Sequence, residues 1–177
     1  PLVRIEDAAI GARDQLAAMR AHNESGAQPV QNGFSRVLPE ELVGEFRPLD
    51  PGEGPQLRSA AWLARASDGM VAWSSSVSVE NAYRLRLELT RVQLPPGSRG
   101  WVWGAGESAP LSLPLDFVDE NRTLWTPSVE GDTVYLEVQV PEEALQRGTP
   151  EALLRIGRVL QLFDVSPQGG SCLVDAT

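Results

Sequence analysis

The sequence Tyr-Arg-Leu-Arg-Leu-Glu-Leu-Thr at residues 83–90 alternates apolar and polar side chains. Because successive side chains of a β-strand point to opposite faces, this alternation predicts a strand with one buried and one solvated face. Residues 134–140, Val-Tyr-Leu-Glu-Val-Gln-Val, repeat the pattern. Turn sequences follow or precede such segments, as in Leu-Pro-Pro-Gly at 94–97 and Glu-Gly-Asp at 130–132. Short strands separated by turns predict a mainly β fold, an antiparallel β-sandwich of jelly-roll type.

The segments on either side complete the predicted order of elements. Residues 57–65 and 70–79 are predicted to form a hairpin closed by Ser-Asp-Gly at 67–69. Residues 153–163 fit either a helix or a strand. Apolar residues at three- and four-residue spacing over residues 5–21 predict an N-terminal α-helix.

Four parts follow from this order. We expect an N-terminal helix over residues 1–26, a β-sandwich over 57–165 and a junction tail over 166–177. Residues 27–56 are rich in Pro and Gly, which favour turns and extended chain, so they are predicted as an extended arm. Within this arm, a short strand fits Phe34 to Leu38.

Length, apolar content and charge exclude several classes of protein. The chain has 177 residues, of which 42% are hydrophobic, as expected for one folded domain. A net charge of −9 argues against a nucleic-acid partner or an anionic membrane surface. No apolar run approaches the ~20 residues needed to cross a bilayer, so no membrane span is predicted.

Few side chains are suited to chemistry. With one Cys, Cys172, and one His, His22, the chain can form neither an internal disulfide nor a zinc site built from several Cys or His ligands. His22 lies at a predicted helix end, and Cys172 lies in a Gly-rich tail with no basic neighbour to lower the pKa of its thiol. We therefore predict no catalytic residue.

Two loops resemble ligand sites in composition. Gly-Ala-Gly-Glu-Ser-Ala at 104–109 has the letters of a dinucleotide fingerprint, but Pro110 and alternating leucines follow it where the fingerprint requires a helix. The acidic residues at 116–121 could hold calcium, although a solvated surface loop is the favoured interpretation. No cofactor and no metal site are predicted.

The tryptophans are the strongest candidates for binding. Trp101 and Trp103 point the same way on one predicted strand, with Val102 opposite. Two such rings could form a platform for sugar rings or for a partner protein, or they could fill the sandwich core. Trp125 is included in the same candidate surface.

Several motifs, in this order and spacing, resemble one family. They are Gly-Phe-Ser-Arg-Val-Leu-Pro at 33–39, Arg-Leu-Arg-Leu at 84–87, Val-Gln-Leu-Pro-Pro-Gly at 92–97, Trp-Val-Trp-Gly at 101–104, Leu-Trp-Thr-Pro-Ser-Val-Glu-Gly-Asp at 124–132 and Leu-Arg-Ile-Gly-Arg-Val at 154–159. Together they resemble the non-catalytic N-terminal pro-region of bacterial lysyl-endopeptidase-like serine proteases. Gly-Gly-Ser-Cys-Leu-Val-Asp at 169–175 is similar to the start of the mature enzyme.

The resemblance implies a partner and a cellular setting. A trypsin-like catalytic domain from the same precursor would follow Thr177, and the chain itself would not be an enzyme. The junction would lie at Gln168, Gly169, Gly170 and Ser171, and Cys172 would form a disulfide with that absent domain. Such a bond persists in a secreted or periplasmic bacterial protein.

The function implied is that of a pro-domain that acts as a folding template and as an inhibitor of the catalytic domain. The alternative is a carbohydrate- or surface-binding module that targets an attached enzyme through Trp101 and Trp103. An adaptor domain retained in the mature protein is a third possibility. All fifteen basic residues are Arg. This composition is explained either by a GC-rich coding sequence or by resistance to a Lys-specific protease.

Overall fold

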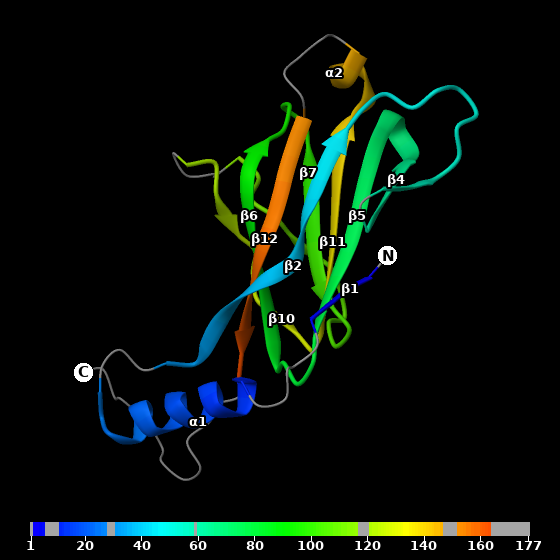
Figure 1. Ribbon diagram of the computed structural model, residues 1–177. Helices are drawn as coiled ribbons and strands as arrows, with labels where there is room; N and C mark the ends of the chain where they lie inside the picture. The colour runs from blue at the N-terminus through cyan, green and yellow to red at the C-terminus, as the bar shows by residue number, and fades with distance from the viewer. Residues whose placement is uncertain are drawn as a thin grey trace.

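The structure is a computed structural model that describes residues 2–5, 11–27, 31–58, 60–116, 121–146 and 152–163. Two β-sheets pack face to face, as Figure 1 shows, and a helix lies at one end of this sandwich. The prediction of a mainly β, antiparallel sandwich with an N-terminal helix is confirmed.

The larger sheet has seven strands. Its order is β3 (Gln56–Arg58), β4 (Ala61–Arg65), β5 (Met70–Val79), β11 (Thr133–Pro141), β7 (Arg99–Gly104) and β8 (Leu111–Ser112). The seventh strand, β1 (Leu2–Ile5), pairs in parallel with residues 76–79 of β5, beyond the part of β5 that β4 covers. The predicted hairpin is present for residues 61–65 and 70–79, which form the antiparallel pair of β4 and β5. Residues 57–58, predicted as part of the same strand as 61–65, belong instead to β3, which folds back on β4.

The smaller sheet has five strands. Its order is β10 (Val129–Glu130), β6 (Arg84–Gln93), β12 (Ala152–Leu162) and β2 (Gly33–Phe46), and β9 (Leu124–Trp125) pairs with the same edge of β6 as β10. The two clearest alternating segments of the sequence are central strands, β6 in this sheet and β11 in the larger one. β11 buries every second side chain, and β6 does so from Leu85 to Leu89.

The ambiguous segment 153–163 is a strand, because β12 lies between β6 and β2 and pairs with both. Its register shifts between Ile156 and Arg158. The buried side chains are therefore those of Ala152, Leu154, Ile156, Val159 and Gln161. An extra residue in the strand accounts for the three-residue step from Ile156 to Val159.

Two predictions at the N-terminal end need correction. Residues 33–46, predicted mainly as an extended arm, form the long strand β2. Pro39 is tolerated there because β2 lies at the edge of its sheet. The helix α1 spans Gly11–Glu24, and Ile5, which we placed in the helix, belongs to β1. In the described part of the chain, the other helices are η1 (Ser67–Gly69) and α2 (Glu142–Gln146).

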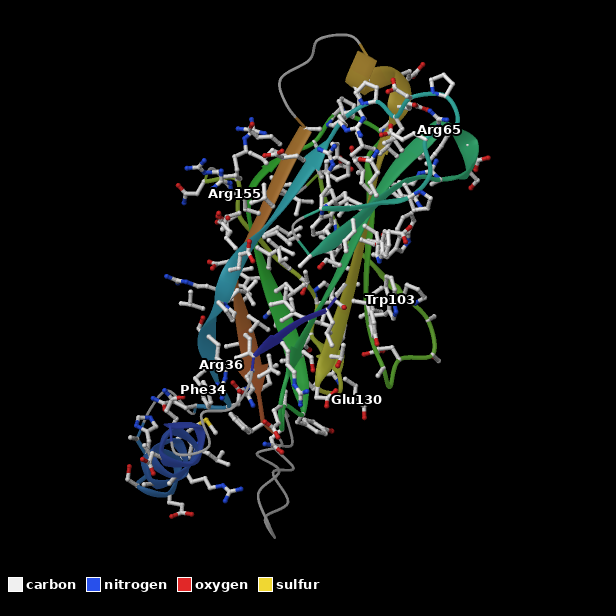
Figure 2. All side chains as sticks on the ribbon, turned by 45° about the vertical axis from the view of Figure 1, so that its right-hand side comes forward. Phe34, Arg36, Arg65, Trp103, Glu130 and Arg155 are labelled. Atoms are coloured by element: carbon white, nitrogen blue, oxygen red, sulfur yellow. The ribbon has the colours of Figure 1, made fainter. Side chains whose placement is uncertain are left out.

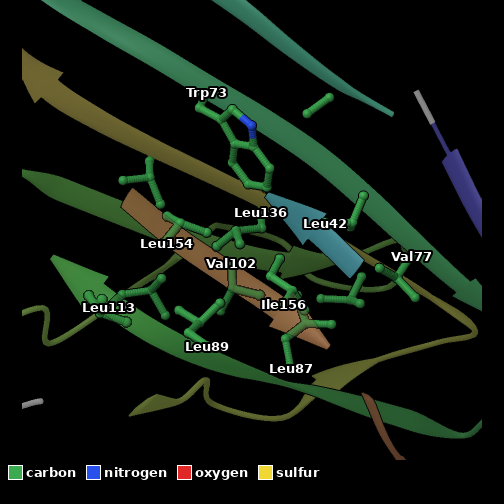
Figure 3. Packing of buried hydrophobic residues seen from close by; sticks show 14 of the residues in the cluster. Leu42, Trp73, Val77, Leu87, Leu89, Val102, Leu113, Leu136, Leu154 and Ile156 are labelled. Carbon is green, nitrogen blue, oxygen red and sulfur yellow. The ribbon is translucent and has the colours of Figure 1, made fainter. Parts of the chain in front are cut away.

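The hydrophobic core fills the space between the sheets (Figure 3). Leu87 and Leu89 of β6 face Val102 and Leu136 of the larger sheet, and none of these side chains is more than 1% exposed. Trp73 is the largest side chain in the core and is 2% exposed. Among the described residues, no helix has the length and apolar character needed to cross a membrane.

Candidate binding surfaces

Trp101 and Trp103 lie on the outer face of the seven-stranded sheet. Val102 of β7 is fully buried and pairs with Leu136, so the neighbouring indoles must point away from the core. Gly100 and Gly104 complete the inward face of β7. A Cβ atom on Gly100 would lie 3.0 Å from Leu113, which already fills the space beneath it. The prediction that both rings share one face is confirmed, and neither ring belongs to the core.

The two indoles have aromatic and polar neighbours on β11. The ring of Trp103 stacks on the ring of Tyr135, with centroids 5.6 Å apart and planes 12° from parallel. Glu137 lies directly opposite Trp101. The Nε2 atom of Gln139 donates a hydrogen bond of 2.7 Å to the Oε1 atom of Glu137. Figure 2 shows the ring of Trp103 on the outer side of the sheet. An open pocket of about 350 Å³ is lined by Trp101, Trp103, Pro110, Glu137 and Gln139.

A third indole continues this surface. Trp62 of β4 is opposite Ser74, Ser74 is opposite Glu137, and Glu137 is opposite Trp101. Residues that are opposite one another in neighbouring strands point to the same face, so these side chains form one row across four strands. The side chain of Trp62 is 42% exposed. We call the surface formed by Trp62, Trp101, Trp103 and Tyr135 the indole face.

Trp125 does not belong to the indole face. It lies in β9 opposite Glu88, on the outer side of the five-stranded sheet. The guanidinium of Arg86 is 5.8 Å from the centroid of its ring. The three predicted tryptophans are thus divided between the two opposite faces of the sandwich.

A second cluster of aromatic and polar side chains lies at the end of the sandwich beside α1. The rings of Phe34 and Phe163 have centroids 5.2 Å apart, and the guanidinium of Arg36 is 4.8 Å from the centroid of Phe34. The Nε atom of Arg36 donates a 2.5 Å hydrogen bond to Oε1 of the fully buried Gln161. Figure 2 shows Phe34 and Arg36 at this end. No motif in the sequence predicts this cluster, because the contact between Arg36 and Gln161 joins segments that are 125 residues apart.

The opposite end of the sandwich is held by two ion pairs. Arg65 lies 2.7 Å from Glu142 of α2, and Arg47 lies 2.7 Å from Glu53. The hydrogen bond from Arg65 lowers the pKa of Glu142 below its usual value, and the hydrogen bond from Arg47 does the same for the pKa of Glu53. Gln56 also donates a hydrogen bond to Glu53. These contacts join β4 to α2 and hold residues 47–53 against the start of β3, and a structural role explains both shifts.

The remaining candidates are the predicted junction and the two loops that resemble ligand sites in composition. Gln168, Gly169, Gly170, Ser171 and Cys172 lie outside the described residues. Within the described part of the chain, no three His, Cys, Asp or Glu side chains are grouped as metal ligands would be. The segment that resembles a dinucleotide fingerprint begins at the end of β7, where Gly104 packs on the backbone of Glu130.

These observations define a class of protein, a two-sheet β-sandwich domain with an aromatic outer face and an N-terminal helix at one end. The family model described as the lysyl endopeptidase N-terminal domain matches residues 8–149, and the chain belongs to that family. No curated protein matches the sequence. The resemblance found in the sequence motifs is therefore confirmed at the level of the family. Domains of this family are the N-terminal part of a protease precursor.

Proposed function

We propose that this chain is a pro-domain that acts as a folding template and inhibitor of a trypsin-like catalytic domain in the same precursor. The observation that carries the proposal is membership of the lysyl endopeptidase N-terminal domain family over residues 8–149. A template or inhibitor needs a rigid complementary surface and no reactive group of its own. Covalent linkage would keep the two domains at a high effective concentration during folding.

The end of the sandwich beside α1 is where we place the catalytic domain. The strand β12 ends at Leu162 at this end (Figure 1), so the chain leaves the sandwich beside Phe34, Phe163 and α1. The proposed junction at residues 168–171 is 5–8 residues beyond Phe163. Since an extended chain spans at most ~3.5 Å per residue, the junction lies within about 28 Å of Phe163.

The helix α1 offers a contact surface at this end. Met19 is buried, whereas Ala17, Ala18 and Ala21 are exposed. Small side chains allow close approach of a partner backbone and lose no rotamer entropy when they are buried. We propose that the catalytic domain packs on these alanines.

The test uses the whole precursor and the separate domains. We expect the catalytic domain to fold into active protease only when this chain is supplied in cis or in trans. We also expect the purified chain to inhibit the mature protease. Ala18→Asp, in the proposed interface, should weaken inhibition at least tenfold, a change typical of an interface hot spot.

Ser67→Asp is the matched control, because it adds the same charge at the far, exposed end of the sandwich. It should leave the inhibition constant within about twofold. Normal activity of protease made without this chain, together with no inhibition by the purified chain, would overturn the proposal. Equal loss of inhibition in both variants would reject α1 as the contact surface.

We further propose that the precursor is cut at Gln168–Ser171 and that Cys172 remains with the mature enzyme in a disulfide, which requires a secreted or periplasmic setting. Residues 159–171 contain neither Lys nor Arg. Cleavage in this segment would therefore need a protease whose specificity is not for basic residues.

The absence of Lys supports a further part of the same proposal, that the domain resists a Lys-specific catalytic domain. Its fifteen basic residues are all Arg.

Gly54 lies in an exposed loop, and a Cβ atom there would meet nothing within 4 Å. We expect lysyl endopeptidase to cut Gly54→Lys at residue 54 and to leave Gly54→Arg and the wild-type chain intact, as gel electrophoresis and mass spectrometry of the fragments would show. If folded Gly54→Lys stayed intact, the fold rather than the composition would be the source of resistance.

A further inference from the structure

We propose that the indole face binds a neutral polysaccharide chain. This site is additional to the proposed pro-domain role. It lies on the seven-stranded sheet, whereas the chain leaves the sandwich from β12 of the five-stranded sheet. It would hold the precursor, or the released domain, on a glycan surface.

The indole face is rigid before any ligand arrives. Trp101 and Trp103 project from β7, whose other face is fixed in the core by Val102. The stacking of Trp103 on Tyr135 holds that ring nearly parallel to its neighbour. A preformed aromatic surface loses little conformational entropy when it binds a ligand. The apolar C–H faces of a pyranose ring can pack flat on such rings.

Polar groups lie where hydroxyl groups of a sugar would need partners. Glu137 and Gln139 line the same pocket as the two indoles and are joined by a 2.7 Å hydrogen bond. That bond fixes both side chains, while a carboxylate has lone pairs for about four hydrogen bonds. Apolar walls with a few fixed polar groups are typical of small-molecule sites.

The row of side chains across the sheet favours a chain of sugars over a single ring. From β4 to β8 it runs through Trp62, Ser74, Glu137, Trp101 and Ser112, so that hydrogen-bonding side chains lie between and beyond the indoles. Trp62 and Trp101 are separated by three inter-strand steps, or ~14 Å. This length fits several linked sugar units that stack at both ends.

Charge selects the kind of glycan. The chain carries a net charge of −9, and Glu137 adds a carboxylate inside the pocket itself. Both features repel an anionic polysaccharide and the phosphates of a nucleic acid, whose bases would otherwise stack on the same rings. A neutral glycan is the ligand that matches both the rings and the charge.

The experiment measures retardation of the whole chain in native gels that contain hydroxyethylcellulose, laminarin or, as the anionic probe, heparin. We expect retardation by at least one neutral polymer and none by heparin. Trp103→Ala should weaken this binding at least tenfold. Trp125→Ala, which removes a half-buried indole from the opposite face of the sandwich, should leave it within about twofold.

A second variant guards against misfolding of Trp103→Ala. Pro110 is exposed and lines the pocket from a loop, so Pro110→Asp should reduce binding while leaving the core intact. Lack of retardation by either neutral polymer, or equal loss in Trp125→Ala, would overturn the proposal. Loss of protease inhibition in Trp103→Ala without any glycan binding would also overturn it and identify a protein-docking face. Full inhibition by Trp103→Ala, together with lost glycan binding, would support it and separate it from the pro-domain role.

Discussion

Trp73→Ala should lower the free energy of unfolding by about 3–5 kcal/mol, as expected when a large buried side chain leaves a cavity. Trp73 is 2% exposed and lies opposite Leu63 and Val138 in its own sheet. It also reaches the other sheet, because a Cβ atom built on Gly44 of β2 would lie 3.3 Å from its ring. Its loss therefore removes contacts between the two layers.

Trp62→Ala is the control for this prediction. It removes the same side chain from the neighbouring strand β4, but from the outer face, where 42% of the side chain is exposed. We expect a loss of about 1 kcal/mol or less. Denaturant unfolding followed by circular dichroism measures both values. Similar losses in the two variants would contradict the assignment of Trp73 as the residue that joins the layers. If the domain is a folding template, Trp73→Ala should also reduce the yield of active protease.

Gly104→Ala should destabilise the domain by ~3 kcal/mol, near the upper end of the usual range for overpacking. The added Cβ atom would overlap the backbone carbonyl oxygen of Glu130 in β10. The obstacle is backbone and cannot rotate away, so β7 and β10 must separate. β7 belongs to one sheet and β10 to the other, so the change acts at a direct contact between the backbones of the two layers.

Gly106→Ala, two residues further along, is the control for Gly104→Ala. There the added atom would lie 3.4 Å from the flexible side chain of Glu130, and we expect a change within about 0.5 kcal/mol. For a domain of this size, 1 kcal/mol corresponds to ~2–4 °C in Tm, so Gly104→Ala should melt ~6–12 °C below the wild type. Equal melting temperatures for the two variants would show that β10 can move away at little cost.

The sequence predicted strands correctly where apolar and polar side chains alternate regularly over many residues. Residues 84–90 and 134–140 lie within β6 and β11, central strands whose burial follows the sequence pattern over these residues. Of β2, only residues 34–38 were predicted as a strand, because Pro39 and the Pro and Gly residues around it are typical of turns and extended chain. β12 was ambiguous because its irregularity between Ile156 and Arg158 breaks the period of two.

The same limit applies to the binding surfaces. Alternation within one strand was enough to predict that Trp101 and Trp103 share a face. It could not assign Trp125 to a sheet, because sheet membership depends on pairing between segments far apart in the chain. The cluster of Phe34, Arg36 and Gln161 depends on contacts across 125 residues of sequence, and no local pattern reports such contacts.

The position of β2 has a consequence for the behaviour of the domain in concentrated solution. As an edge strand, β2 could accept a strand from another molecule and start ordered aggregation. Pro39 removes one amide donor, and the exposed carboxylates of Glu40 and Glu45 repel a second copy that carries the same charges. Many copies could therefore accumulate side by side without polymerising into fibrils.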